Sequence, residues 1–176
     1  METLGNPALV VPWQPPEFFE SLDGVKKLAD TLNEANIIAK SHGIRLGYHN
    51  HHAEMHPIDG KPAILVLSKM VDPGVFFEVD TYWAQTGGVE AADLVRTLGA
   101  KAPLLHIKDG PCVKGEPMTA VGDGVMDVEA IVNAGKPYTE WMIVELDACA
   151  TDIIEAVAKS YSYLVGKGFA HGTKKT

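Results

Sequence analysis

The chain has 176 residues, of which 46% are hydrophobic and 22% are charged, values that are ordinary for a globular domain. Its formal net charge of −8 argues against a nucleic-acid partner, because phosphate binding requires clustered Lys and Arg side chains. No apolar stretch approaches the roughly 20 residues that a membrane-spanning helix needs, so we expect no membrane association. The beginning of the sequence lacks the basic segment of a signal peptide, and two cysteines, Cys112 and Cys149, are too few for a disulfide framework. We therefore expect a cytoplasmic protein with reduced thiols.

Five short apolar runs predict buried β-strands, because aliphatic and β-branched residues follow one another in them without polar alternation. The runs cover residues 8–13, 44–50, 75–80, 104–109 and 141–147, and their starts are 36, 31, 29 and 37 residues apart. This spacing is typical of βα units, in which a helix crosses over between parallel strands. Amphipathic patterns predict helices over residues 16–41, 62–70, 89–98, 127–135 and 151–165, with Asp127 and Thr151 as N-caps.

Strands that alternate with helices predict a parallel α/β fold. An open, doubly wound sheet is the structural alternative, but no strand leads into a Gly-rich phosphate loop, and polar strand ends are spread over four units. Dispersed polar ends fit the mouth of a barrel better than a single crevice. A complete barrel takes roughly 250 residues. The sequence therefore predicts one domain, residues 1–176, that forms a partial (β/α)8 TIM barrel of about five βα units and lacks the first three.

Three of the predicted strands end in residues that bind divalent cations or move protons, namely Asp80, His106 and Glu145. Asp80 shares a strand face with Glu78, and its alternative role is to cap the following loop. His106 lies within an apolar run. The ordinary interpretation of such a histidine is a buried side chain whose ring nitrogens are hydrogen-bonded in the core. The predicted strands before and after it carry acidic residues, however, and these favour a metal ligand. Glu145 lies between aliphatic residues, and burial of a carboxylate there is costly without a cation or hydrogen-bond partners.

A further polar run, residues 48–54, carries three histidines and Glu54. Strand alternation directs His49 and His51 to one face, and Glu54 can return from the loop to the same site. We expect this run to supply a fourth ligand, and the sequence leaves open whether it is Glu54, His49 or His51. Trp83, which follows Asp80, is a candidate for the wall of a pocket.

Five motifs, in the same order along the chain, resemble those of the sugar phosphate isomerase/epimerase family, the xylose-isomerase-like TIM barrels: residues 47–51 with Glu54, 79–83, 105–110, 121–124 and 143–147. The resemblance implies a site for a divalent Mn, Mg, Co or Zn ion at the mouth of a barrel. The ligands that it implies are Glu54, Asp80, His106 and Glu145. Many relatives carry the first glutamate within the strand, where this chain has Tyr48-His49, so His49 and His51 are substitutes for it or substrate contacts.

The resemblance also implies a divalent-metal-dependent sugar or sugar-phosphate isomerase or epimerase, which transfers a proton next to a carbonyl through an enediolate. Glu145 is then the base, and Glu54 or a nearby histidine is the acid. Lys108 then steadies the developing oxyanion or binds a substrate hydroxyl. The residues expected to contact the small-molecule sugar are His49, His51 and Trp83. Dehydration or hydration of keto-sugars and inososes is the alternative reaction on the same scaffold.

The lack of three βα units predicts open strand edges and exposed apolar helix faces, which a homo-oligomer would cover. A non-catalytic, truncated remnant that keeps the site but lacks a closed pocket is therefore a second hypothesis. A barrel endonuclease for damaged DNA shares the metal chemistry, but the net charge of −8 disfavours it.

Overall fold

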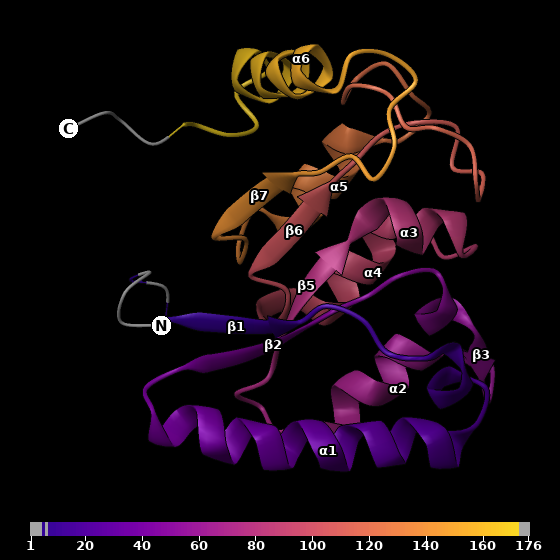
Figure 1. Ribbon diagram of the computed structural model, residues 1–176, viewed down its shortest axis with the longest axis vertical. Helices are drawn as coiled ribbons and strands as arrows, with labels where there is room; N and C mark the ends of the chain where they lie inside the picture. The colour runs from indigo at the N-terminus through magenta and orange to yellow at the C-terminus, as the bar shows by residue number, and fades with distance from the viewer. Residues whose placement is uncertain (1–4, 6, 173–176) are drawn as a thin grey trace.

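The computed structural model of the protein describes residue 5 and residues 7–172, so the outer ends of the predicted domain lie outside the described residues. At its centre is a parallel sheet of five strands in the order β1-β2-β5-β6-β7. The strands are β1 (Ala8–Val11), β2 (Arg45–His49), β5 (Phe76–Asp80), β6 (Leu104–Ile107) and β7 (Trp141–Val144). The sheet curls into a half-barrel with helices along its outer side (Figure 1). The predicted α/β fold of five βα units, a partial barrel, is confirmed.

Each strand of the sheet is followed by at least one helix. The α-helices are α1 (Leu22–Ser41), α2 (Ala63–Met70), α3 (Thr81–Thr86), α4 (Ala91–Leu98), α5 (Val128–Gly135) and α6 (Ile153–Gly166). Short 3-10 turns occur at η2 (Pro16–Phe19), η3 (Ala53–Met55) and η4 (Gly99–Lys101), and β3 (Pro57–Ile58) pairs antiparallel with β4 (Lys61–Pro62) before α2. No helix in the described part of the chain is long and apolar enough to cross a membrane.

The helix boundaries differ from the prediction in three places. The helix expected over residues 16–41 is divided, because Ser21 caps α1 by accepting a hydrogen bond from the backbone of Gly24 at 3.1 Å. The N-cap of α6 is Asp152 and not Thr151, since the Asp152 carboxylate accepts from two backbone amides of the first turn. The helix α3 was not predicted; it is only six residues long and is capped by Asp80.

Strand alternation gives the sheet one apolar and one polar face. Tyr48, Phe77 and Leu105 lie on the outer face, where they are fully buried in the core between the sheet and the helices. The residues that alternate with them along each strand point to the inside of the curled sheet. The register pairs His49 with Glu78 and Asp80 with His106 in adjacent strands, so that these polar side chains become neighbours near the carboxyl ends of the strands.

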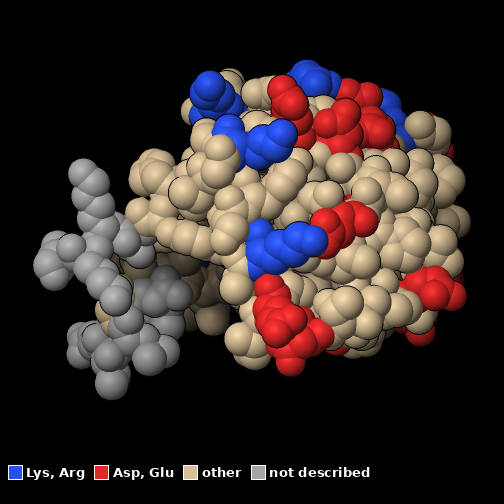
Figure 2. All heavy atoms as spheres, turned by 90° about the horizontal axis from the view of Figure 1, so that it is seen from above, with Lys and Arg blue, Asp and Glu red and all other residues tan. Residues whose placement is uncertain are grey.

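The half-barrel remains open on one side in the described residues. The strands β1 and β7 each have a partner on one side only, and Leu9, Trp13 and Trp141 at these edges are 50%, 54% and 58% exposed. A groove of about 690 Å³ runs beside β7 and is lined by apolar side chains such as Leu164 and Phe169. Figure 2, which views the molecule from the α6 end, shows broad uncharged areas between separate acidic and basic groups. The uncovered side of the half-barrel, formed by the free edges of β1 and β7 and by this groove, is called the open wall below.

The loop after β6 is organised by one buried carboxylate. Asp109 accepts hydrogen bonds from the backbone amides of Gly110, Gly122 and Met126 at 2.8, 2.9 and 3.1 Å. Gly124 passes so close that a Cβ atom at this position would overlap with the Asp109 carboxylate and the Gly110 amide. The glycines of the 121–124 motif therefore allow the loop to fold back over Asp109.

We expect Gly124→Ala to lower the free energy of unfolding by about 1–3 kcal/mol, because the added methyl group has no space beside Asp109. Urea denaturation followed by circular dichroism measures this change. The matched control is Gly166→Ala, at the end of α6, where nothing lies within 4 Å of the added Cβ. The control should be neutral or stabilising by up to about 1 kcal/mol, and equal losses in both variants would contradict the assigned role of Gly124.

Candidate functional site

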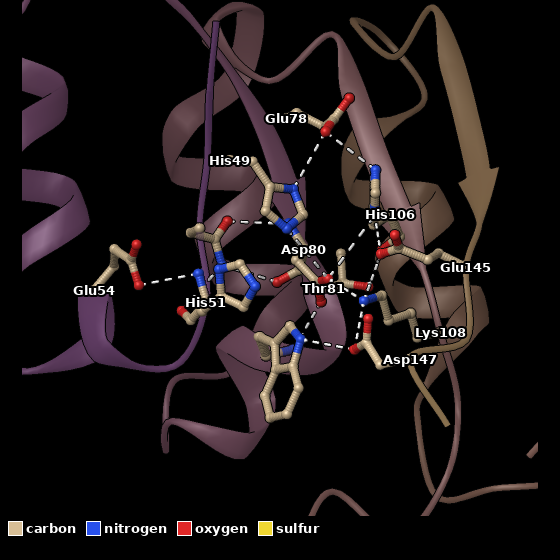
Figure 3. Close-up of polar contacts among 12 residues, drawn as sticks. His49, His51, Glu54, Glu78, Asp80, Thr81, His106, Lys108, Glu145 and Asp147 are labelled. Atoms are coloured by element: carbon tan, nitrogen blue, oxygen red, sulfur yellow. Dashed lines mark hydrogen bonds and ion pairs between the residues drawn. The ribbon is translucent and has the colours of Figure 1, made fainter. Parts of the chain in front are cut away.

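Three buried side chains from neighbouring strands meet inside the curl of the sheet. His49 comes from β2, Asp80 from β5 and His106 from β6, and they are 6%, 0% and 8% exposed. One ligand atom from each lies within 4.8 Å of the others, an arrangement that could hold a metal ion. Figure 3 shows both imidazole rings turned toward the Asp80 carboxylate. We call these three residues the central triad.

The two carboxylate oxygens of Asp80 have different surroundings. Oδ1 accepts a hydrogen bond from the backbone amide of Trp83 at 2.8 Å and so caps α3. Oδ2 accepts no hydrogen bond; it lies 3.0 Å from Lys108 Nζ, 3.8 Å from His49 Nε2 and 4.0 Å from His106 Nδ1. Burial raises the pKa of Asp80 and outweighs the attraction of Lys108. The capping role and the ligand role are thus compatible, because each uses a different oxygen.

Asn50 fixes the backbone of Asp80 from the neighbouring strand. Its side-chain amide donates to the carbonyl of Asp80 at 3.1 Å, and its side-chain oxygen accepts from the amide of Asp80 at 3.0 Å. Asn50 is fully buried. It lies within the 47–51 motif, but no local pattern in the sequence predicts this role, which depends on the register between β2 and β5.

Glu78 lies between the two imidazoles, on the side away from Asp80. Its Oε1 atom is 3.3 Å from His49 Nδ1 and 3.1 Å from His106 Nε2. Burial acts to raise the pKa of Glu78, but the contacts with His106 and His49 outweigh it and lower the pKa to about 2. Sequence alternation placed Glu78 on the same face as Asp80 but assigned it no function.

Lys108 joins three carboxylates beneath the mouth of the site. Its side chain is 1% exposed, and Nζ lies 3.0 Å from Asp80, 2.6 Å from Glu145 and 2.9 Å from Asp147. Burial acts to lower the pKa of Lys108, but Asp80, Glu145 and Asp147 outweigh it and raise the pKa. Lys108 is therefore protonated at neutral pH and offsets part of the negative charge of the site.

Glu145 is a carboxylate next to the central triad that is partly open to solvent. It follows β7, its side chain is 44% exposed, and Oε2 lies 2.8 Å from His106 Nδ1 and 2.6 Å from Lys108 Nζ. Burial acts to raise the pKa of Glu145, but Lys108 and His106 outweigh it and lower the pKa. Glu145 is therefore ionised at neutral pH and accessible to a bound molecule.

The structure does not bring Glu54 to the central triad. Its Oε1 accepts a hydrogen bond from Tyr48 Oη at 2.6 Å, and its Oε2 accepts one from the backbone amide of His51 at 3.0 Å. Tyr48 faces the helices, and Glu54 is 1% exposed on that side of β2. Burial raises the pKa of Glu54. Figure 3 shows the Glu54 carboxylate at the His51 backbone, away from Asp80.

The rim of the site is formed by His51, His52 and Trp83. The ring of His51 lies 5.0 Å from that of His49 and 6.1 Å from that of Trp83, and the ring of His52 lies 5.6 Å from that of Trp83. Trp83 Nε1 donates to Asp147 Oδ2 at 3.2 Å, a partner that the sequence did not reveal. The indole is thus held at the rim of the site, and its role in a pocket wall stays a prediction.

The pKa of His51 is lowered to about 4, first by burial and then by electrostatic interaction with His49 and Lys108. In the unfolded chain His51 takes up its proton near its ordinary pKa of 6.5. Protonation between these values therefore favours the unfolded state, and the stability contributed by neutral His51 is lost as pH falls from about 6.5 to about 4.

We expect His51→Gln to remove the pH dependence that comes from His51. The free energy of unfolding of the variant should therefore decline less than that of the wild type as pH falls from about 6.5 to about 4. Chemical denaturation at a series of pH values measures the difference. The control is His56→Gln, which replaces an exposed histidine of the same loop and should leave the slope unchanged. Parallel curves for His51→Gln and the wild type would contradict the assigned shift.

The donor set of the central triad suits a divalent cation. Two imidazole nitrogens and one carboxylate oxygen are ligands that Zn²⁺, Co²⁺ and Mn²⁺ accept. The buried Asp80 Oδ2 has no hydrogen bond in the described structure and pairs closely only with Lys108, so a cation would add positive charge to a site in which carboxylates outnumber lysines. The site is therefore chemically suited to a metal ion.

A curled parallel sheet with histidines and carboxylates at the carboxyl ends of its strands is the arrangement of TIM-barrel proteins. Residues 1–163 match the family described as the xylose isomerase-like TIM barrel, and the chain belongs to this family. The resemblance predicted from the five motifs is thus confirmed.

Solved structures of sugar phosphate isomerase/epimerases are similar to this chain. Two such proteins from Parabacteroides distasonis ATCC 8503 are 29% and 25% identical to it, with TM-scores of 0.83 and 0.82. They match 96% and 97% of this chain, which spans only 60% and 62% of their own length. A probable 3-DHS dehydratase from Bacillus anthracis shares the fold at 11% identity and a TM-score of 0.69, over 91% of this chain and 63% of that one. No curated protein matches the chain.

Proposed function

We propose that the protein is a divalent-metal-dependent isomerase or epimerase of sugars or sugar phosphates. The observation that carries this proposal is the central triad, in which the buried Asp80 Oδ2 lies between two imidazoles and next to the solvent-accessible Glu145. The similarity to sugar phosphate isomerase/epimerases supports the substrate class. The substrate itself is a small polyhydroxylated molecule with a carbonyl group.

The metal ligands in this proposal are His49, Asp80, His106 and Glu145. His49 takes the place that the family resemblance implied for Glu54, because the Glu54 carboxylate is already bonded to Tyr48 and to the His51 backbone. Two imidazole ligands favour Mn²⁺, Co²⁺ or Zn²⁺ over Mg²⁺, which prefers oxygen.

In this proposal the bound cation and the side chains around it have separate roles in the reaction. A bound divalent cation supplies Lewis-acid stabilisation of negative charge on neighbouring substrate oxygens. Glu145, ionised and half-exposed, removes the proton from the carbon next to the carbonyl. Lys108 stabilises the negative charge that develops on the substrate, and it also keeps Glu145 ionised at neutral pH. His51, neutral at pH 7, and the Trp83 indole contact the sugar at the rim.

Dehydration is the second candidate reaction, because removal of the same proton can expel a neighbouring hydroxyl group. The fold shared with a probable 3-DHS dehydratase shows that the architecture occurs in a protein given that name. A non-catalytic remnant is the third candidate, and the open wall favours it for this chain alone, because one side of the sugar pocket is uncovered.

We expect His49→Gln to weaken Mn²⁺ binding by more than the roughly 10–100-fold that loss of an outer partner of a metal ligand typically costs. Glu54→Gln should leave the affinity near that of the wild type but lower the free energy of unfolding by about 1–3 kcal/mol, because buried hydrogen bonds are weakened. Isothermal titration with Mn²⁺ and urea denaturation separate the two effects. If Glu54→Gln instead lost Mn²⁺ affinity and His49→Gln kept it, Glu54 would be the ligand and the assignment of His49 would be wrong.

We expect Glu145→Gln to reduce the exchange of solvent deuterium into ketoses by at least about 100-fold, since the general base is removed. Proton NMR of a ketose panel in D₂O with Mn²⁺-loaded protein, after removal of the paramagnetic metal, measures the exchange. The control is Glu129→Gln, an exposed carboxylate on α5. Metal binding without exchange in the wild type would favour the remnant, and exchange that survives in Glu145→Gln would exclude Glu145 as the base.

A further inference from the structure

Glu78 touches both histidines of the central triad through one oxygen atom. Oε1 lies 3.3 Å from His49 Nδ1 and 3.1 Å from His106 Nε2. The other nitrogen of each ring faces the opposite way, since His49 Nε2 is 3.8 Å and His106 Nδ1 is 4.0 Å from Asp80 Oδ2. Figure 3 shows Glu78 and Asp80 on opposite sides of the two rings.

This placement has a chemical consequence for metal binding. An imidazole binds a metal ion through the nitrogen that carries no proton, so the other nitrogen must carry one and needs an acceptor. The Glu78 carboxylate lies at ion-pair distance from the second nitrogen of both rings. His49 Nδ1 makes no hydrogen bond in the described structure, so the acceptor role of Glu78 toward this ring belongs to the metal-bound state. A single side chain can therefore set the protonation of both ligands.

The two imidazole rings present opposite nitrogens to Asp80 and to Glu78. His49 faces Asp80 with Nε2 and Glu78 with Nδ1, whereas His106 faces Asp80 with Nδ1 and Glu78 with Nε2. Glu78 would thus hold the two histidines as opposite tautomers. In the described structure His106 Nδ1 is hydrogen-bonded to the ionised Glu145 carboxylate at 2.8 Å, with Nδ1 as the donor, so metal binding at Nδ1 requires that this proton be displaced.

We propose that Glu78 is a positioning residue that orients His49 and His106 for metal binding and fixes them as opposite tautomers. This proposal rests on the proposed metal site of the central triad. Glu78 acts through the two imidazoles and not on the substrate, because its carboxylate lies on the side of the rings away from Asp80. In the described residues its ion-pair contacts are to these two rings alone.

Asp147 provides a matched control for Glu78. It is a second carboxylate near the central triad, but its contacts are with Lys108 and the Trp83 indole, and none of them is with an imidazole nitrogen. Glu78→Gln and Asp147→Asn each remove one negative charge from the same region while the size of the side chain is kept. A simple effect of net charge would therefore weaken metal binding in both variants alike.

The first test is titration of the wild type and both variants with Co²⁺, followed by calorimetry and by the visible absorption of the bound metal. We expect Glu78→Gln to lower the Co²⁺ affinity by about 10–100-fold and to alter the absorption spectrum, because the ligands are less well oriented. Asp147→Asn should bind Co²⁺ nearly as the wild type does. Equal losses in both variants, or none in Glu78→Gln, would overturn the proposal.

The second test needs no variant and so does not depend on how a variant folds. Long-range ¹H–¹⁵N correlation spectra of the Zn²⁺-loaded wild type report which nitrogen of each histidine carries the proton. We expect the proton on Nδ1 of His49 and on Nε2 of His106. The same tautomer in both rings would overturn the proposal for Glu78. Failure of the wild type to bind either metal would instead overturn the proposed metal site itself, and with it the role of Glu78.

Discussion

The burial of Asp80 between two imidazoles and a lysine is the constraint on which the site depends. One carboxylate oxygen caps α3, and this cap sets the direction of the chain toward Trp83. The other oxygen lacks a hydrogen bond and faces His49, His106 and Lys108. A buried anion of this kind is costly unless positive charge surrounds it. The neighbouring strands supply that charge in part, and they leave an arrangement that a divalent cation would complete.

The same strands build the core and the site, because alternate residues point to opposite faces. Tyr48, Phe77 and Leu105 pack under the helices, while the residues next to them in sequence point into the curl. Stability is thus concentrated on the outer face, and the polar residues on the inner face are held by rigid strands. At the open wall the sheet ends, and the inner face is not enclosed by further strands in the described residues. The chain spans about 60% of the length of its similar solved structures, close to the share that five of eight βα units make up.

The apolar runs predicted the strands, and Asp80, His106 and Glu145 stand out because each interrupts or ends such a run. The structure brings these three side chains together, and their role as metal ligands stays a prediction. It did not predict the short helix α3, whose six residues are too few for a periodic pattern. The first ligand could not be chosen between Glu54 and His49, because the choice depends on where the chain turns after β2 and on the bond from Tyr48 to Glu54. The parts played by Asn50 and Glu78 depend on the register between strands, which no local pattern reveals.

The most direct test of this account is anomalous diffraction from a crystal of the protein loaded with Mn²⁺. The account predicts one strong anomalous peak in bonding contact with His49, Asp80, His106 and Glu145, while Glu54 stays bonded to Tyr48. A peak coordinated by Glu54, or no peak at the central triad at saturating Mn²⁺, would contradict it.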